Sequence, residues 1–174
     1  PSDFQRVFGV SLRAAQECIK DHRQDLFLKI RNGLYTLRAA PAQEEAIANR
    51  LYAPSYISFE YALSRYSIIP ESVYSITSVT TRITREFTVN GKSFTYSHIK
   101  KPAYRGYRTE KIGGVTVLMA VPEKAFVDYL YFVDLKRKTL NERLNVRNLK
   151  KNVVLEYAKL FGRKSLMNLV REIL

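Results

Sequence analysis

The side chains best suited to chemistry in this sequence are basic and polar, and they gather near the N-terminus. From Ser11 to His22, apolar residues fall on one side of an expected helix, and Arg13, Gln16 and Lys20 fall on the other. Arginine and glutamine hydrogen-bond to base edges, and lysine pairs with phosphates. The spacing is typical of a helix that reads a nucleic-acid groove. It also fits an ordinary helix with a solvated charged face.

A β-hairpin is expected directly after this helix. Two β-rich runs, residues 26–31 and 34–37, flank Asn32-Gly33, a pair that favours a two-residue turn because both positions need positive φ. Such a turn would pair Arg31 with Leu34 and Lys29 with Thr36. The register then predicts an apolar face of Leu28, Ile30, Tyr35 and Leu37, and an opposite face of Lys29, Arg31, Leu34 and Thr36.

The elements around these residues have the order of a winged helix-turn-helix. Ser2-x-x-Gln5 resembles a capping box for a helix from Asp3 to Phe8, and Gly9 would end that helix. In a winged helix the second helix enters the major groove and the hairpin touches the DNA backbone or minor groove. The first helix of such a domain has no counterpart here, and we expect it upstream of Pro1. The predicted DNA-binding residues are Ser11, Arg13, Gln16, Lys20, Lys29, Arg31 and Asn32.

The composition limits the classes of protein to consider. The chain has 174 residues and a formal net charge of +13, which favours a polyanionic partner. Its single cysteine, Cys18, excludes a disulfide framework, and the apolar run 115–121 is too short to span a membrane. The N-terminus does not resemble a signal peptide, so we expect a cytoplasmic protein.

The remaining chain predicts a second domain. The two predicted domains are residues 1–40 and residues 41–174, and the second is expected to be α+β with antiparallel hairpins. Its expected elements are helices at 44–50, 59–66 and 122–133, a loop at 52–56, a β-rich run at 73–80, a hairpin at 85–96, and strands at 104–111 and 115–121. The helix from Pro122 is largely apolar and is expected to cross the sheet.

Charge is concentrated in the last forty residues. Residues 135–174 carry eleven Lys/Arg and three acids, a net +8, and are expected to form basic helices separated at Gly162. On one helix, Arg143, Arg147, Lys150 and Lys151 would form a basic stripe and a possible second phosphate-binding surface. Leu140 and Leu144 fall within the same arc, which favours an ordinary solvated surface.

Signatures of catalysis and metal binding are missing from the sequence. It has no Gly-rich phosphate loop, no Gly-x-Ser-x-Gly elbow and no His-Glu-x-x-His helix. His22, expected on the inner side of its helix, is not at ligand spacing with His98. Glu123, Lys124 and Asp128 suggest acid–base chemistry, but a helix start with surface charges is the favoured interpretation. We therefore expect a protein that is not an enzyme and that needs no cofactor and no metal.

Four ordered segments between about Gly9 and Tyr131 resemble the AbiEi-type antitoxins, the regulators of type IV toxin–antitoxin systems. They are Leu28-x-Ile30-Arg31-Asn32-Gly33-Leu34-Tyr35; Ala48-Asn49-Arg50-Leu51-Tyr52-x-Pro54-Ser55-Tyr56-Ile57-Ser58 with Ala62-Leu63; Ile76-Thr77-Ser78-Val79-Thr80-Thr81-Arg82; and Ala120-x-Pro122-Glu123-Lys124-Ala125-x-x-Asp128. The basic C-terminal helices match the family only loosely.

The resemblance implies a winged helix on operator DNA and a C-terminal antitoxin domain. Such a protein represses its own operon and counteracts a nucleotidyltransferase-like toxin without forming a stable complex with it. The rival interpretations are a protein-interaction module, in which a tyrosine-rich domain binds the toxin directly, and an enzyme that acts on nucleic acid.

Overall fold

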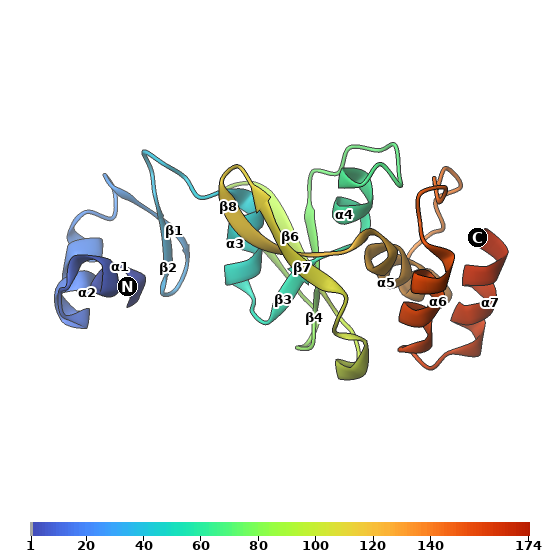
Figure 1. Ribbon diagram of the computed structural model, residues 1–174. Coiled ribbons are helices and arrows are strands. Elements are labelled where there is room, and N and C mark those ends of the chain that lie inside the picture. The colour runs from blue at the N-terminus through green and yellow to red at the C-terminus, as the bar shows by residue number, and fades with distance from the viewer. Residues whose placement is uncertain (1) are drawn as a thin grey trace.

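The computed structural model describes residues 2–174 of an α+β chain. Its N-terminal unit consists of two helices and a hairpin, drawn in blue in Figure 1, and its elements are α1 (Ser2–Phe8), α2 (Leu12–Asp21), β1 (Phe27–Arg31) and β2 (Leu34–Leu37). Gly9 has a φ of +64° between the helices, and the Ser11 hydroxyl caps α2 by accepting a 3.2 Å hydrogen bond from the Ala14 N–H. The cap and the order of elements agree with the sequence pattern.

The register of the first hairpin differs from the prediction. Arg31 lies opposite Leu34 as expected, but Lys29 lies opposite Tyr35, and Leu28 lies opposite Thr36. The register shifts between Lys29 and Arg31 because Ile30 is an extra residue in β1, a β-bulge. The predicted apolar face is therefore wrong, since Lys29 shares a face with Tyr35. Both Lys29 and Arg31 are nevertheless exposed.

Fewer residues of α2 are buried than the sequence pattern predicts. Ala15 and Ile19 are buried, and Phe27 of β1 is buried in the same unit. Leu12 is 46% exposed, and His22 is exposed, so the expected inward position of His22 is wrong. His22 closes the helix through its backbone N–H, which donates to the carbonyl of Cys18. This small unit thus buries few side chains of its own.

A six-stranded mixed sheet follows, in the order β5-β6-β4-β3-β8-β7. Its strands are β3 (Ser55–Ile57), β4 (Ile76–Thr80), β5 (Arg85–Val89), β6 (Lys92–His98), β7 (Tyr107–Ile112) and β8 (Val115–Ala120). The pairs β3–β8 and β4–β6 are parallel, and the others are antiparallel. The predicted hairpin at 85–96 is confirmed, with Phe87 opposite Phe94. The predicted loop at 52–56 is wrong in part, because it contains the buried start of β3.

Helices lie on the sheet and beyond one end of it (Figure 1). They are α3 (Glu44–Leu51), α4 (Phe59–Arg65), the short 3-10 helix η1 (Lys101–Ala103), α5 (Pro122–Asp134), α6 (Lys151–Lys159) and α7 (Lys164–Ile173). The Tyr96 hydroxyl donates to the Ala48 carbonyl at 2.7 Å and joins the sheet to α3. The helix α5 packs against α4, α6 and α7 and also contacts β8, so it lies at the centre of a helical layer that adjoins the sheet.

The last forty residues are only partly helical. Helices α6 and α7 agree with the predicted separation at Gly162, which has a φ of +64°. Residues 135–150 form turns and irregular backbone where helix was expected. One large apolar core joins the sheet to α3–α7, while Ala15, Ile19 and Phe27 lie outside it. Within residues 2–174, no helix is long and apolar enough to span a membrane.

Candidate functional site

One flank of α2, which includes the buried Ile19, meets the tip of the first hairpin at a hollow. This hollow has a volume of about 220 Å³ and is lined by Gln16, Ile19, Lys20, Arg23, Gly33 and Tyr35. Gly33 has a φ of +78°, which lets the two-residue turn close without the strain that a side chain would add. The structure therefore places two of the predicted DNA-binding residues, Gln16 and Lys20, beside the hairpin turn that holds Asn32.

Most cations around this hollow have no acidic partner. Lys20, Arg23, Lys29 and Arg31 are exposed, and within residues 2–174 none of them forms an ion pair. Arg13 differs, because its guanidinium lies 3.1 Å from Glu17 and both side chains are largely exposed. An exposed pair of this kind contributes little stability, and it leaves Arg13 free to exchange partners.

One predicted residue, Ser11, has a structural role, and one basic residue was missed. The Ser11 hydroxyl is engaged as the cap of α2, and the Asn32 carbonyl accepts a 3.4 Å hydrogen bond from Arg31. Arg23 lies beyond the end of α2 but lines the hollow. Helical spacing alone could not have identified it, because α2 ends at Asp21 and Arg23 belongs to the turn before β1.

The predicted C-terminal stripe is not formed. Arg143 and Arg147 lie in the irregular segment before α6, and Arg143 pairs with Glu71. Lys150 precedes α6, and the Lys151 ammonium donates to the carbonyl of Leu174. Leu140 and Leu144 pack against the core, as the sequence pattern suggested. These four basic residues therefore do not share a helix face.

A second cluster of ionisable groups lies inside the protein, between β3 and α5. Lys124 and Asp128 are both fully buried and form an ion pair one turn apart on α5. The other Asp128 carboxylate oxygen accepts hydrogen bonds from the hydroxyls of Tyr56 at 3.0 Å and Ser58 at 2.8 Å. The fold thus brings together residues from two of the four segments that carry the family resemblance.

Aromatic and glycine packing seals this cluster. The Lys124 ammonium lies 4.9 Å from the centroid of the Phe161 ring, and the ring of Tyr107 stacks on Tyr56 at 4.7 Å. A Cβ at Gly106 would lie 2.6 Å from a ring carbon of Tyr157, and the φ of +80° also disfavours any residue other than glycine there. These side chains exclude water from the ion pair.

Burial has opposite effects on the two members of the pair. It lowers the pKa of Lys124 and raises the pKa of Asp128, because removal from water disfavours the charged form of each. Burial and the neighbouring Asp128 carboxylate also raise the pKa of Tyr56. Each charge is stabilised mainly by the other, and neither group is accessible to a substrate in this structure.

This cluster corrects the interpretation of residues 123–128. Lys124 and Asp128 were predicted to be surface charges, but both are 0% exposed. Glu123 is half-buried and accepts a hydrogen bond from the backbone N–H of Lys150 at 3.3 Å. The sequence held a signal, since an acid and a base four residues apart in an otherwise apolar helix are positioned to pair in the interior.

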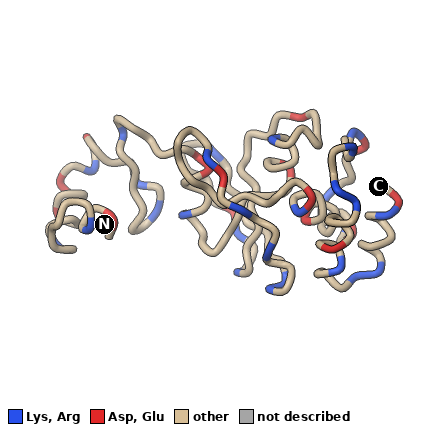
Figure 2. The backbone as a smooth tube through the Cα atoms, viewed as in Figure 1, with Lys and Arg blue, Asp and Glu red and all other residues tan. Residues whose placement is uncertain are grey.

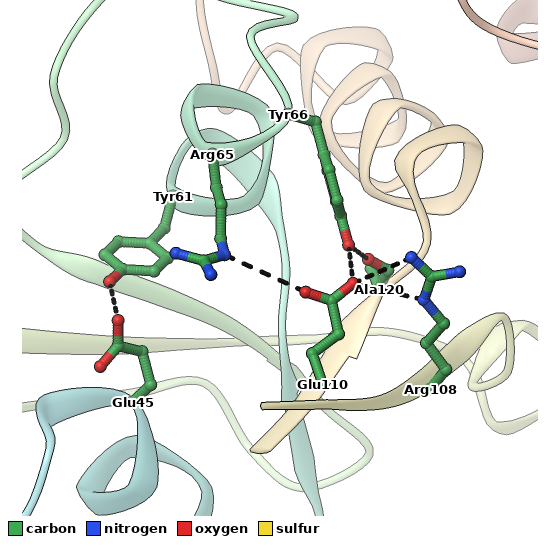
Figure 3. Close-up of polar contacts among 7 residues, drawn as sticks. All are labelled: Glu45, Tyr61, Arg65, Tyr66, Arg108, Glu110 and Ala120. Carbon is green, nitrogen blue, oxygen red and sulfur yellow. Dashed lines mark hydrogen bonds and ion pairs between the residues drawn. The ribbon is translucent and has the colours of Figure 1, made fainter. Parts of the chain in front are cut away.

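A third polar network joins α4 to the neighbouring elements (Figure 3). Glu110 of β7 accepts hydrogen bonds from the Tyr66 hydroxyl at 2.7 Å and from the Arg108 guanidinium at 3.1 Å. The Tyr61 hydroxyl donates to Glu45 of α3 at 2.5 Å. Burial, together with these carboxylates, raises the pKa of both tyrosines. The carboxylates of Glu45 and Glu110 and the hydroxyls of Tyr61 and Tyr66 all have hydrogen-bond partners within the protein, which indicates a role in holding α4 in place.

Within residues 2–174, no group of three or more His, Cys, Asp or Glu side chains is arranged to hold a metal ion. Among known proteins, no family model matches the chain and no curated protein matches it significantly. Geometry and charge are therefore what support a function, and they point to the hollow between α2 and the hairpin.

Proposed function

We propose that this protein binds double-stranded DNA through α2 and the β1–β2 hairpin. The observation that carries the proposal is the hollow where Gln16, Lys20 and Arg23 lie beside the hairpin turn at Gly33. Four exposed cations at this end of the molecule have no acidic partner within residues 2–174, so they are available for phosphates. The two helices and the hairpin would then act as a winged helix-turn-helix.

The dimensions of α2 suit the major groove. Its ten residues span about 15 Å at 1.5 Å per residue, and the groove is about 12 Å wide. Gln16 and Arg13 would face base edges, where amide and guanidinium groups form paired hydrogen bonds. Lys20 and Arg23 would contact phosphates beside the groove, and Lys29 and Arg31 would reach the backbone from the hairpin.

We further propose the biological role that the family resemblance implies. The protein would act as the antitoxin of a type IV toxin–antitoxin system. It would repress its own operon and counteract a nucleotidyltransferase-like toxin without a stable complex. The sheet and helices of residues 41–174 would carry the antitoxin activity.

The direct test is duplex DNA binding measured by fluorescence anisotropy across a range of salt concentrations. The Lys20→Gln/Arg23→Gln variant should flatten the dependence of log Kd on log salt by about 2, because each lost phosphate contact contributes about 0.9. The matched control is Lys100→Gln/Lys101→Gln, which removes the same charge from exposed positions around η1. Gln16→Ala should reduce the preference for the protein's own promoter over random DNA. Equal losses in the two double variants would contradict the proposal.

A second candidate, a protein-interaction module, is favoured by apolar exposure on the N-terminal unit. The side chains of Val7 and Phe8 are 70% and 63% exposed, and both line a groove of about 370 Å³ with Phe27 and Leu37. Apolar patches of this kind mark contact surfaces. If the toxin binds here, it should co-purify with the wild-type chain and be lost from a Val7→Ser/Phe8→Ser variant that still binds DNA.

A further inference from the structure

The end of the molecule farthest from α2 carries a second basic hollow. It lies between α6 and α7, has a volume of about 440 Å³, and is lined by Lys159, Gly162, Arg163, Lys164, Met167, Asn168 and Arg171. Figure 2 shows Lys and Arg in blue along this pair of helices, at the opposite end from the N-terminal unit. Four of the seven lining residues are cationic and none is acidic.

Most of the cations that line this hollow form no ion pair within the described part of the chain, unlike Arg143 of the predicted C-terminal basic stripe. Lys159, Lys164 and Arg171 are exposed, and within residues 2–174 none forms an ion pair. Arg163 pairs with Asp134 of α5 at 2.5 Å, which fixes the turn between the two helices. Three uncompensated positive charges thus remain around one concavity, a pattern that attracts phosphates.

The spacing on α7 matches the spacing at the proposed DNA interface. Lys164, Asn168 and Arg171 are spaced i, i+4 and i+7, as are Gln16, Lys20 and Arg23. On α7 the amide and the two cations share one helix face, whereas Arg23 lies beyond the end of α2 and lines its hollow from the turn that follows. On α7 the opposite face is fixed by Leu166 and Val170, which are fully buried, so the basic face is directed outward.

We propose that the α6–α7 hollow binds the phosphate backbone of a second stretch of duplex DNA. The bridging part of this inference rests on the proposed function, since the first stretch is the one held by α2. The sheet and α5 separate the two basic ends (Figure 1), so the two stretches would lie on opposite sides of the molecule. One chain could then join two DNA segments without a second copy of itself.

The test compares two triple variants of the full chain that remove equal charge. Lys159→Gln/Lys164→Gln/Arg171→Gln alters the hollow, and the control Arg137→Gln/Arg147→Gln/Lys150→Gln alters exposed cations in the same forty residues. Each protein is loaded on immobilised duplex DNA, and the capture of a second, labelled duplex is measured. The hollow variant should load through α2 but capture at least about tenfold less labelled DNA, since each phosphate contact contributes severalfold to affinity at physiological salt. The control should capture as the wild type does.

Three results would overturn the inference. These are full capture by the hollow variant, as expected if a dimer forms the bridge; equal loss in the control; and capture of labelled RNA in place of duplex DNA. Titration of duplex DNA with the Lys20→Gln/Arg23→Gln variant, and separately with the hollow variant, distinguishes the two proposals. If that variant binds duplex normally and the hollow variant does not, the function proposed for α2 fails and the phosphate-binding role of α6–α7 stands.

Discussion

The buried pair of Lys124 and Asp128 leads to a prediction in which two substitutions show opposite pH dependence. Lys124→Met leaves the Asp128 carboxylate in the interior without its cation, and Asp128→Asn leaves the Lys124 ammonium without its anion. Both groups are fully buried, so neither substitution can be relieved by water in this structure. Removal of one partner from such a pair typically destabilises a protein by about 3–5 kcal/mol.

The loss of stability in each variant follows from the free-energy cost of neutralising the charge that is left without a partner. In Lys124→Met, Asp128 escapes its charge by binding a proton. From an ordinary pKa of 3.8, that costs about 4 kcal/mol at pH 7 and about 2 kcal/mol at pH 5. In Asp128→Asn, Lys124 escapes by losing a proton. From an ordinary pKa of 10.5, that costs about 5 kcal/mol at pH 7 and about 2 kcal/mol at pH 9.

The direction of each pH effect follows from the linkage between proton binding and folding. In Lys124→Met the folded pKa of Asp128 is raised further, so the folded state binds the extra proton and stability falls as pH rises from 5. In Asp128→Asn the folded pKa of Lys124 is lowered, so the unfolded state holds the extra proton and stability increases towards pH 9. The intact pair has no net charge whichever partner holds the proton. In the wild type it therefore contributes neither of these two dependences of stability on pH.

Urea unfolding of the wild type, both single variants and Lys124→Met/Asp128→Asn at pH 5, 7 and 9 measures these differences. At pH 7 the double variant should lose less stability than the sum of the single variants, because it leaves no unpaired charge. Two single variants with the same pH slope, or additive losses at pH 7, would refute the interpretation of the cluster as a buried ion pair.

Three further substitutions or titrations test other features. Gly106→Ala should lower the free energy of unfolding by about 1–3 kcal/mol more than Gly91→Ala, since both have positive φ but only Gly106 contacts Tyr157; equal losses in urea unfolding would contradict this. Ser11→Ala should destabilise the N-terminal unit by about 1 kcal/mol, and Ser11→Gly by less; amide hydrogen exchange in α2 reports both, and unchanged exchange would exclude the cap. Because burial raises the pKa of Tyr56, Tyr61 and Tyr96, part of the phenolate absorbance should appear only when alkali unfolds the chain, whereas full absorbance from all twelve tyrosines before unfolding would show that these three are accessible.

The local sequence pattern predicted the register of the hairpin at residues 85–96 correctly. It predicted the register of the hairpin at residues 26–37 only near the turn. The Asn90-Gly91 turn sets Phe87 opposite Phe94, because nothing interrupts the pairing on either side. The Asn32-Gly33 turn also forms, but Ile30 bulges out of β1 and packs against the core of the larger unit. A turn dipeptide fixes the register only near the turn. A bulge further along depends on neighbours that are distant in sequence.

The strand β3 is a second element whose structure depends on neighbours that are distant in sequence. Its sequence, Ser55 to Ile57, follows a proline and has the local character of a loop, yet all three residues are buried. It pairs with β4 on one side and with β8 on the other, so its extended form is imposed by two neighbours. Propensity within a three-residue segment is too weak to predict such a strand.

The residues of the proposed DNA interface could be predicted from the sequence more readily than those of the buried cluster around Lys124. Helical spacing placed Gln16 and Lys20 on one face, whereas Arg23 joins them from the turn that follows the end of α2 at Asp21. The burial of Lys124 depends on Tyr56 and Phe161, which no periodicity connects to it. Likewise, the pairing of Arg143 with Glu71 joins positions far apart in the chain, so the predicted basic stripe could not be corrected from its own sequence.

The two outer strands of the sheet restrict how copies of the protein can assemble. At one edge, β5 carries Arg85 and Glu86, both exposed; at the other, β7 carries Arg108 and Lys111, also exposed. Charged side chains on edge strands oppose backbone pairing with another chain, which protects against aggregation. Any assembly formed on DNA would therefore be built through helices and side chains, and the sheet would keep its six strands.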